Sequence, residues 1–253
     1  MSNHITYAFL LSTIAGLSTV LGSIIIFLKN SNPHKTINAA LSFAAAVMIT
    51  ISITDLIPEA MDQLKQTYQI TPCIFLLLIS INIGIIISML IDKYLPEQQT
   101  SIKNKRLYRI GIISMLAIIL HNIPEGMATF ITSSTNITLG ISLTLAIACH
   151  NIPEGISISI PIYYSTHSKR KAISYTFLSG LSELLGAILA YLFLSPFINN
   201  IIMGTLFAII AGIMLHIACY ELLPTAKKYN ESKTTIIFFL IGVGFMLLNH
   251  IIL

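Results

Sequence analysis

Eight stretches of about 20 mainly apolar residues follow one another along this chain, and each is long enough to cross a bilayer as a helix. They run over residues 5–28, 36–57, 72–91, 108–132, 137–163, 171–194, 199–223 and 234–253. Short polar or proline-containing segments separate them, and the longest of these segments is 92–107. The pattern predicts an all-α integral membrane protein of eight transmembrane helices in one domain, 1–253.

Composition supports the same class. Charged residues make up only 9% of the chain, against about 25% in soluble domains. Such a chain cannot cover a water-facing surface, which excludes a soluble globular enzyme, a disordered protein and a nucleic-acid partner, and leaves the lipid bilayer. The three cysteines lie far apart in apolar stretches, so neither a disulfide nor a thiolate metal site is expected.

The basic residues predict an orientation. Thirteen of the 14 lysines and arginines fall in or beside the connections after the first, third, fifth and seventh spans, and only Lys65 falls on the other side. Because cytoplasmic loops carry the excess of Lys and Arg, both termini are expected outside the cytoplasm. Residues 92–107 are then a cytoplasmic loop.

Several carboxylates lie where charge is costly. Five of the ten acidic residues fall within or at the ends of spans: Asp55, Glu125, Glu154, Glu183 and Glu221. Intramembrane acids mark functional sites by default. No lysine or arginine lies in the cores of the fourth to sixth spans, so protons or a bound cation must neutralise these acids.

One hexapeptide, His-Asn-Ile-Pro-Glu-Gly, occurs twice, at 121–126 and 150–155. Its His and Glu share a helical face, and imidazole with carboxylate suits divalent transition metals. Its Pro removes a helical hydrogen bond, and its Gly permits close approach of a neighbouring helix. The candidate metal ligands are His121, Asn122, Glu125, His150, Asn151, Glu154 and Glu183. This set suits one ion or two bridged ions.

Other polar residues and other functions stay open. Asp55 is either an interfacial cap or part of the ion path, and His216 with Glu221 is either a pathway element or a satisfied polar pair. An intramembrane metal-dependent hydrolase is one alternative function, although the HExxH helix of zinc proteases does not occur here. A proton- or sodium-coupled carrier of organic solutes is another. We therefore expect a transporter, not an enzyme.

The span pattern and the doubled motif resemble the ZIP (zinc–iron permease) family, in its bacterial members, over essentially the whole chain. The resemblance implies an inverted repeat of helices 1–3 and 6–8 around helices 4–5, with an elevator-like motion. It also implies uptake across the bacterial inner membrane, chiefly of Zn²⁺, with Fe²⁺, Mn²⁺ and Cd²⁺ plausible, and no catalytic cofactor. Its binuclear site pairs His121, His150, Glu125 and Glu154 in one subsite. Asn122, Asn151, Glu183 and the same two glutamates form the second.

Two features depart from the family pattern. Residues 92–107 contain no histidine, whereas many relatives carry a His-rich loop there, so metal sensing by this loop is not expected. Where relatives often place a Glu or Met on the second span, this chain offers both Met48 and Asp55. The order of metal preference, the energy coupling and the oligomeric state, a homodimer included, stay open.

Overall fold

The computed structural model describes residues 2–27, 32–94, 104–193 and 199–252, and nearly all of them are helical. The α-helices are α1 (Ser2–Leu21), α2 (Pro33–Ile51), α3 (Ile57–Lys65), α4 (Ile70–Tyr94), α5 (Lys105–Thr135), α6 (Ile137–Thr166), α7 (Lys169–Phe193), α8 (Asn200–His216), α9 (Leu223–Lys227) and α10 (Ser232–Ile252). A 3₁₀ turn, Gly22–Phe27, extends α1. π-helical turns join α2 to α3 (Ser52–Leu56) and α8 to α9 (Ile217–Leu222).

These elements form eight helices long and apolar enough to span a membrane within the described residues, so the predicted all-α class and span count are confirmed. Residues 28, 194 and 253, at the ends of predicted spans, and 95–103 of the predicted cytoplasmic loop lie outside the described residues. The second helix continues past the predicted span to Lys65. Pro58 does not end it. The proline lies in the first turn of α3, where a backbone N–H, the group that proline lacks, is not needed for a hydrogen bond within that helix.

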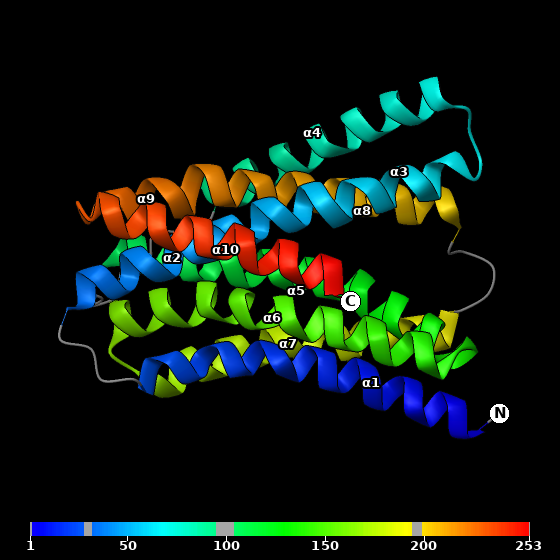
Figure 1. Cartoon of the computed structure of the whole chain (residues 1–253), viewed down its shortest axis with the longest axis horizontal. Helices are drawn as coiled ribbons and strands as arrows, with labels where there is room; N and C mark the ends of the chain where they lie inside the picture. Colours follow the sequence, from blue (N-terminus) through cyan, green and yellow to red (C-terminus); the bar gives the residue numbers. More distant parts are fainter. Residues whose placement is uncertain (1, 28–31, 95–103, 194–198, 253) are drawn as a thin grey trace.

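The bundle has two layers (Figure 1). Helices α1, α5, α6 and α7 form one layer, and α2, α3, α4, α8, α9 and α10 form the other. Successive spans run in opposite directions, so α1 begins and α10 ends at the same end of the bundle. We call this end the terminal face and the other end the opposite face.

Paired contacts reveal an inverted repeat. The Asn151 side chain donates to the carbonyl of Ala15 on α1 (3.0 Å), and the Asn122 side chain donates to the carbonyl of Ser179 on α7 (3.3 Å). The two contacts correspond: the first joins the asparagine of the α6 motif to α1, and the second joins the asparagine of the α5 motif to α7. Gly16 and Gly180 face each other where α1 crosses α7. The carbonyl oxygen of each glycine lies so close to the other that a Cβ there would overlap it. Any larger residue would force these helices apart.

The sequence carries the same repeat. Gly-Leu-Ser-Thr-Val-Leu-Gly at 16–22 matches Gly-Leu-Ser-Glu-Leu-Leu-Gly at 180–186. Asp-Leu-Ile-Pro at 55–58 matches Glu-Leu-Leu-Pro at 221–224, and each match lies in a π-helical turn and the residues after it. The first span (α1) is therefore the counterpart of the sixth span (α7), and the second span (α2 and α3) is the counterpart of the seventh (α8 and α9).

The third pair of helices completes the repeat. Gly84 on α4 approaches the carbonyl of Ile209 on α8, and Gly242 on α10 approaches the carbonyl of Phe43 on α2. Phe43 and Ile209 are 166 residues apart, the same spacing as the Asp-Leu-Ile-Pro and Glu-Leu-Leu-Pro segments. α4 and α10 are thus counterparts. The expected repeat of spans 1–3 and 6–8 around α5 and α6 is present.

Candidate metal centre

The two hexapeptides lie side by side at mid-height of α5 and α6. Both helices continue through Pro124 and Pro153, so each motif keeps its helical spacing. All seven predicted ligands are buried: His121, Asn122, Glu125, His150, Asn151, Glu154 and Glu183. A buried cluster of this polarity within a membrane-spanning bundle needs compensation from a proton or a cation.

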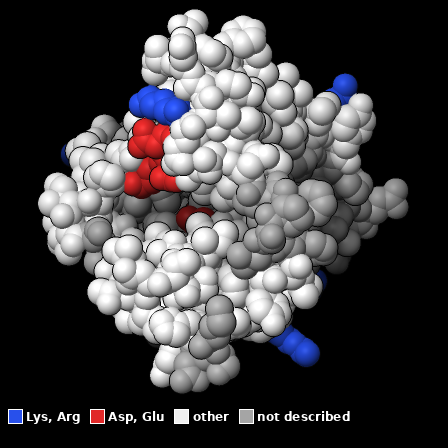
Figure 2. Space-filling view, turned by 90° about the vertical axis from the view of Figure 1, so that its right-hand side faces the viewer, with Lys and Arg blue, Asp and Glu red and all other residues white. Residues whose placement is uncertain are grey.

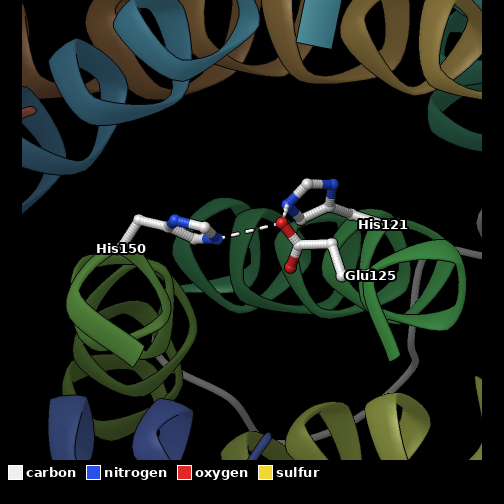
Figure 3. A group of neighbouring side chains, drawn as sticks. All are labelled: His121, Glu125 and His150. Carbon is white, nitrogen blue, oxygen red and sulfur yellow. Dashed lines mark hydrogen bonds and ion pairs between the residues drawn. The ribbon is translucent and has the colours of Figure 1, made fainter. Parts of the chain in front are cut away.

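Histidines from both motifs meet at Glu125 (Figure 3). His150 Nε2 lies 3.0 Å from Glu125 Oε1, and His121 Nε2 lies 3.2 Å from the same oxygen. His121 Nε2 is also 3.5 Å from Glu154 Oε1. One ligand atom from each of His121, Glu125 and His150 fits within 4.8 Å of the others, the size of a single metal site.

The two asparagines lie on the side of the centre that faces α1 and α7. Asn151 Nδ2 donates to Glu183 Oε2 (2.9 Å) as well as to α1, so the α7 carboxylate joins the α6 motif. Asn122 instead donates to the Ser179 carbonyl, one helical turn before Glu183 on α7. The structure thus groups the two histidines with Glu125 and Glu154, and places Asn151 beside Glu183.

The motif glycines set how closely the helices approach. A Cβ on Gly126 would overlap the carbonyl oxygen of Glu183, and a Cβ on Gly155 would overlap the carbonyl oxygen of Thr19. The last residue of each motif therefore brings α7 against α5 and α1 against α6. Thr19 is fully buried and occupies the position on α1 that Glu183 occupies on α7. Thr19 is not among the predicted site residues, although the repeated heptapeptide marks its position.

Many polar atoms of the centre make no hydrogen bond. Eight side-chain nitrogens and oxygens of the predicted ligands are buried without a hydrogen bond among the described residues, including both ring nitrogens of His121 and both carboxylate oxygens of Glu154. An unsatisfied buried polar atom costs about 1–3 kcal/mol. So many in one place need compensation from protons or from a bound cation.

A cavity of about 870 Å³ connects the centre to the terminal face. Glu125 and His150 line its inner end, and Asp55, Glu59 and Asp62 line its outer part. Figure 2 shows a hollow on this face with acidic side chains at its rim and at its floor. Towards the opposite face, buried apolar side chains such as Met48, Ile118 and Ile158 fill the space between the layers. The centre is therefore reached from the terminal face.

The remaining polar residues of the spans lie apart from the centre. His216 Nδ1 lies 2.9 Å from Ser88 Oγ, and its ring stacks on Tyr220 with centroids 5.0 Å apart. These residues lie nearer the opposite face, as does the ion pair between Arg109 and Asp92 (2.9 Å). His250 pairs with Asp55 at the cavity mouth. Met48 belongs to the buried core.

Eight spanning helices, an inverted repeat and a buried polar centre reached from one side define a multi-pass membrane transporter. Comparisons with known proteins identify the family. The family model "ZIP Zinc transporter" matches residues 96–250. The chain is 39% identical to zinc transporter ZupT of Clostridium perfringens, over 96% of this chain and 95% of that protein. It is 42% identical to zinc transporter ZupT of Chlorobaculum parvum, over 93% of each.

The chain belongs to the ZIP zinc transporter family. It is a transporter and not an enzyme, which sets aside the metal-dependent hydrolase. Its substrate class is divalent metal ions, and it is a multi-pass membrane protein.

Proposed function

We propose that this protein takes up Zn²⁺ into the bacterial cytoplasm through the centre on α5, α6 and α7. The observation that carries the proposal is the set of buried ligand atoms without hydrogen bonds at the end of the open cavity. The similar proteins named above are zinc transporters, which agrees with the proposal.

Geometry supports a first metal subsite made of His121, His150, Glu125 and Glu154. Zinc holds His nitrogen and carboxylate oxygen at about 2.0–2.2 Å, so neighbouring donors of a tetrahedral site are about 3.3 Å apart. The donor separations here are 3.0, 3.2 and 3.5 Å. An ion can therefore replace these contacts with little movement of the side chains.

A second subsite is proposed on the side of Asn122, Asn151 and Glu183, with Glu125 and Glu154 as bridges. The side-chain oxygens of both asparagines and Oε1 of Glu183 are buried and have no partner among the described residues. Oxygen donors alone favour harder ions than imidazole does. This mixed donor set supports Fe²⁺, Mn²⁺ and Cd²⁺ as further substrates.

We infer that the terminal face is extracytoplasmic and that the membrane is the bacterial inner membrane. Basic residues support this orientation. Lysines and arginines lie at the opposite face at the end of α4 and at the starts of α5 and α7, and cytoplasmic loops carry the excess of such residues. The structure then represents a state open to the outside. The ion exchanges its waters for the ligands at the centre, after which the layer that contains α5, α6 and α7 shifts in an elevator-like motion and opens the cytoplasmic side.

The experiment is metal uptake by proteoliposomes that contain the purified protein, with radioactive Zn²⁺ outside. Glu125→Gln and His150→Ala should each abolish most uptake, because each removes a ligand without removing a helix. Glu231→Gln is the matched control, since Glu231 lies in the connection before α10, away from the cavity. Wild-type uptake in both centre variants would refute the site. Failure of Zn²⁺ to stabilise the wild-type protein against heating would also contradict a Zn²⁺ site in this centre.

A further inference from the structure

An aspartate and a histidine from different spans meet at the mouth of the cavity. His250 Nδ1, near the end of α10, lies 2.8 Å from Asp55 Oδ1 in the π-helical turn after α2. Their side chains are 53% and 36% exposed, so both are within reach of a hydrated ion. Both line the cavity that ends at Glu125 and His150.

Two further acids continue outward from this pair. Glu59 and Asp62 follow Asp55 by four and seven residues, which places the three carboxylates along one side of the helix, and all three line the cavity. Figure 2 shows acidic side chains gathered at the rim of the hollow. Lys65, 3.5 Å from Asp62, is their basic neighbour at the outermost turn. Acid-lined clefts concentrate cations.

The floor of the same cavity gives an independent indication of a cation. Glu125 is only 8% exposed, and its Oε2 has no hydrogen-bond partner among the described residues. The cavity that gives an ion access to this carboxylate from the terminal face has Asp55 and His250 in its wall. Imidazole nitrogen and carboxylate oxygen are the donors that zinc prefers beside thiolate.

The inverted repeat supplies an internal comparison. In the repeat, Glu221 corresponds to Asp55, and Asp92 corresponds to His250. Asp92 follows Gly84 by eight residues, as His250 follows Gly242, and both glycines pack on a neighbouring span. Near the opposite face the Arg109 guanidinium lies 2.9 Å from the Asp92 carboxylate. The pair at the opposite face therefore has a cation from the protein itself. The pair at the terminal face consists of an imidazole and a carboxylate, both of which can bind a metal.

We propose that Asp55 and His250 form a capture site for a hydrated divalent metal ion at the cavity mouth, a site separate from the buried centre. This inference rests on the proposed function. With two protein ligands, the ion keeps most of its waters and binds weakly. The site raises the metal concentration at the mouth and passes the ion to Glu125 and His150.

Transport kinetics test the capture site first. Its loss lowers the frequency of productive encounters without altering the centre, so His250→Ala and Asp55→Asn should raise KM for Zn²⁺. We expect about a three- to tenfold rise at low ionic strength, with Vmax nearly unchanged, near the lower end of the roughly 10- to 1,000-fold effect of charged clefts. His4→Ala is the matched control, because His4 is an exposed histidine at the same face, near the start of α1 and outside the cavity lining. An unchanged KM in both variants would overturn the proposal.

A third variant separates metal binding from a structural tie between α10 and the π-helical turn. His250→Arg keeps an ion pair with Asp55 but has no lone pair to give to a metal. It should show the same raised KM as His250→Ala. A wild-type KM in His250→Arg would mean that the pair only holds the spans together, and the capture site would be rejected.

Direct binding gives a readout that does not depend on transport. In protein with the centre blocked by Glu125→Gln and Glu154→Gln, calorimetry with Zn²⁺ alone should detect weak residual binding. Adding His250→Ala should remove it, and unchanged residual binding would overturn the capture site. Failure of the proposed function looks different, because the wild-type protein would then transport no Zn²⁺, or Glu125→Gln would transport it at the wild-type rate.

Discussion

Replacing Gly126 by alanine tests how the two helices of the proposed metal centre are held against their neighbours. Gly126 ends the hexapeptide on α5, and its Cα faces the backbone carbonyl of Glu183 on α7. The added methyl group would overlap the oxygen of that carbonyl. Because the obstacle is backbone, no rotamer change can relieve the overlap, and α5 and α7 must separate.

The size of the effect follows from contact distances. Non-bonded heavy atoms approach to about 3.5–4.0 Å, so the helices must move apart by roughly 1 Å or more. Metal–ligand distances tolerate only about 0.2 Å. Overpacking of this kind costs about 1–3 kcal/mol of stability. The displacement carries Glu183 away from the centre, so metal binding should suffer more than folding.

Thermal unfolding in detergent, with and without Zn²⁺, measures both effects, and proteoliposome uptake measures the consequence for transport. Gly126→Ala should unfold at a lower temperature and lose most of its stabilisation by Zn²⁺. Gly244→Ala is the control, because a Cβ at that position on α10 meets nothing within 4 Å. If the two variants unfold and transport alike, the close approach of α5 and α7 does not support the centre.

Two further predictions concern protonation and access. Zn²⁺ affinity should fall as the pH is lowered, because protons compete for His121, His150 and the carboxylates, and calorimetry at neutral and acidic pH checks this. In a cysteine-free background, Leu143→Cys on the cavity lining should react with a membrane-impermeant thiol reagent added outside, whereas Ile118→Cys in the buried core should not. Equal reactivity of the two cysteines would contradict the outward-open state.

Much of the fold was predictable, because bilayer thickness sets the length of each apolar stretch and lysines and arginines avoid spans. The extra turns were not predictable from hydropathy. α3 continues to Lys65 although it carries Glu59 and Asp62, because those acids face a water-accessible cavity and not lipid. Hydropathy averages over all sides of a helix, so it cannot distinguish a cavity-facing side from a loop.

The site was predictable where one motif supplied both residue type and spacing, as at His121 and Glu125. Contacts between distant spans were not. The pairing of Asp55 with His250 joins residues 195 positions apart, and neither lies in a repeated hexapeptide. The signal that was available and missed is the repeat of 16–22 in 180–186, which aligns Thr19 with Glu183.

This alignment shows that the centre is symmetric in backbone but not in charge. Glu125, Glu154 and Glu183 supply three carboxylates, so one divalent ion leaves a net charge of −1 and two ions leave +1 when the histidines are neutral. Thr19 stands where a fourth carboxylate would balance two ions completely. We infer that the threonine keeps the second ion weakly held.

Thr19→Glu should therefore tighten binding of a second Zn²⁺ and slow its release. The surroundings of Glu183 on α7 show that the repeat accommodates a glutamate at this position, since Gly16 and Gly180 make corresponding contacts beside the two residues. Zinc titration should show a tighter second binding step, and uptake should fall because an ion bound more tightly leaves more slowly. Thr19→Gln has the same size without the charge and should not tighten the second step. If the two variants bind the second ion equally, side-chain size controls the centre, and the charge argument is wrong.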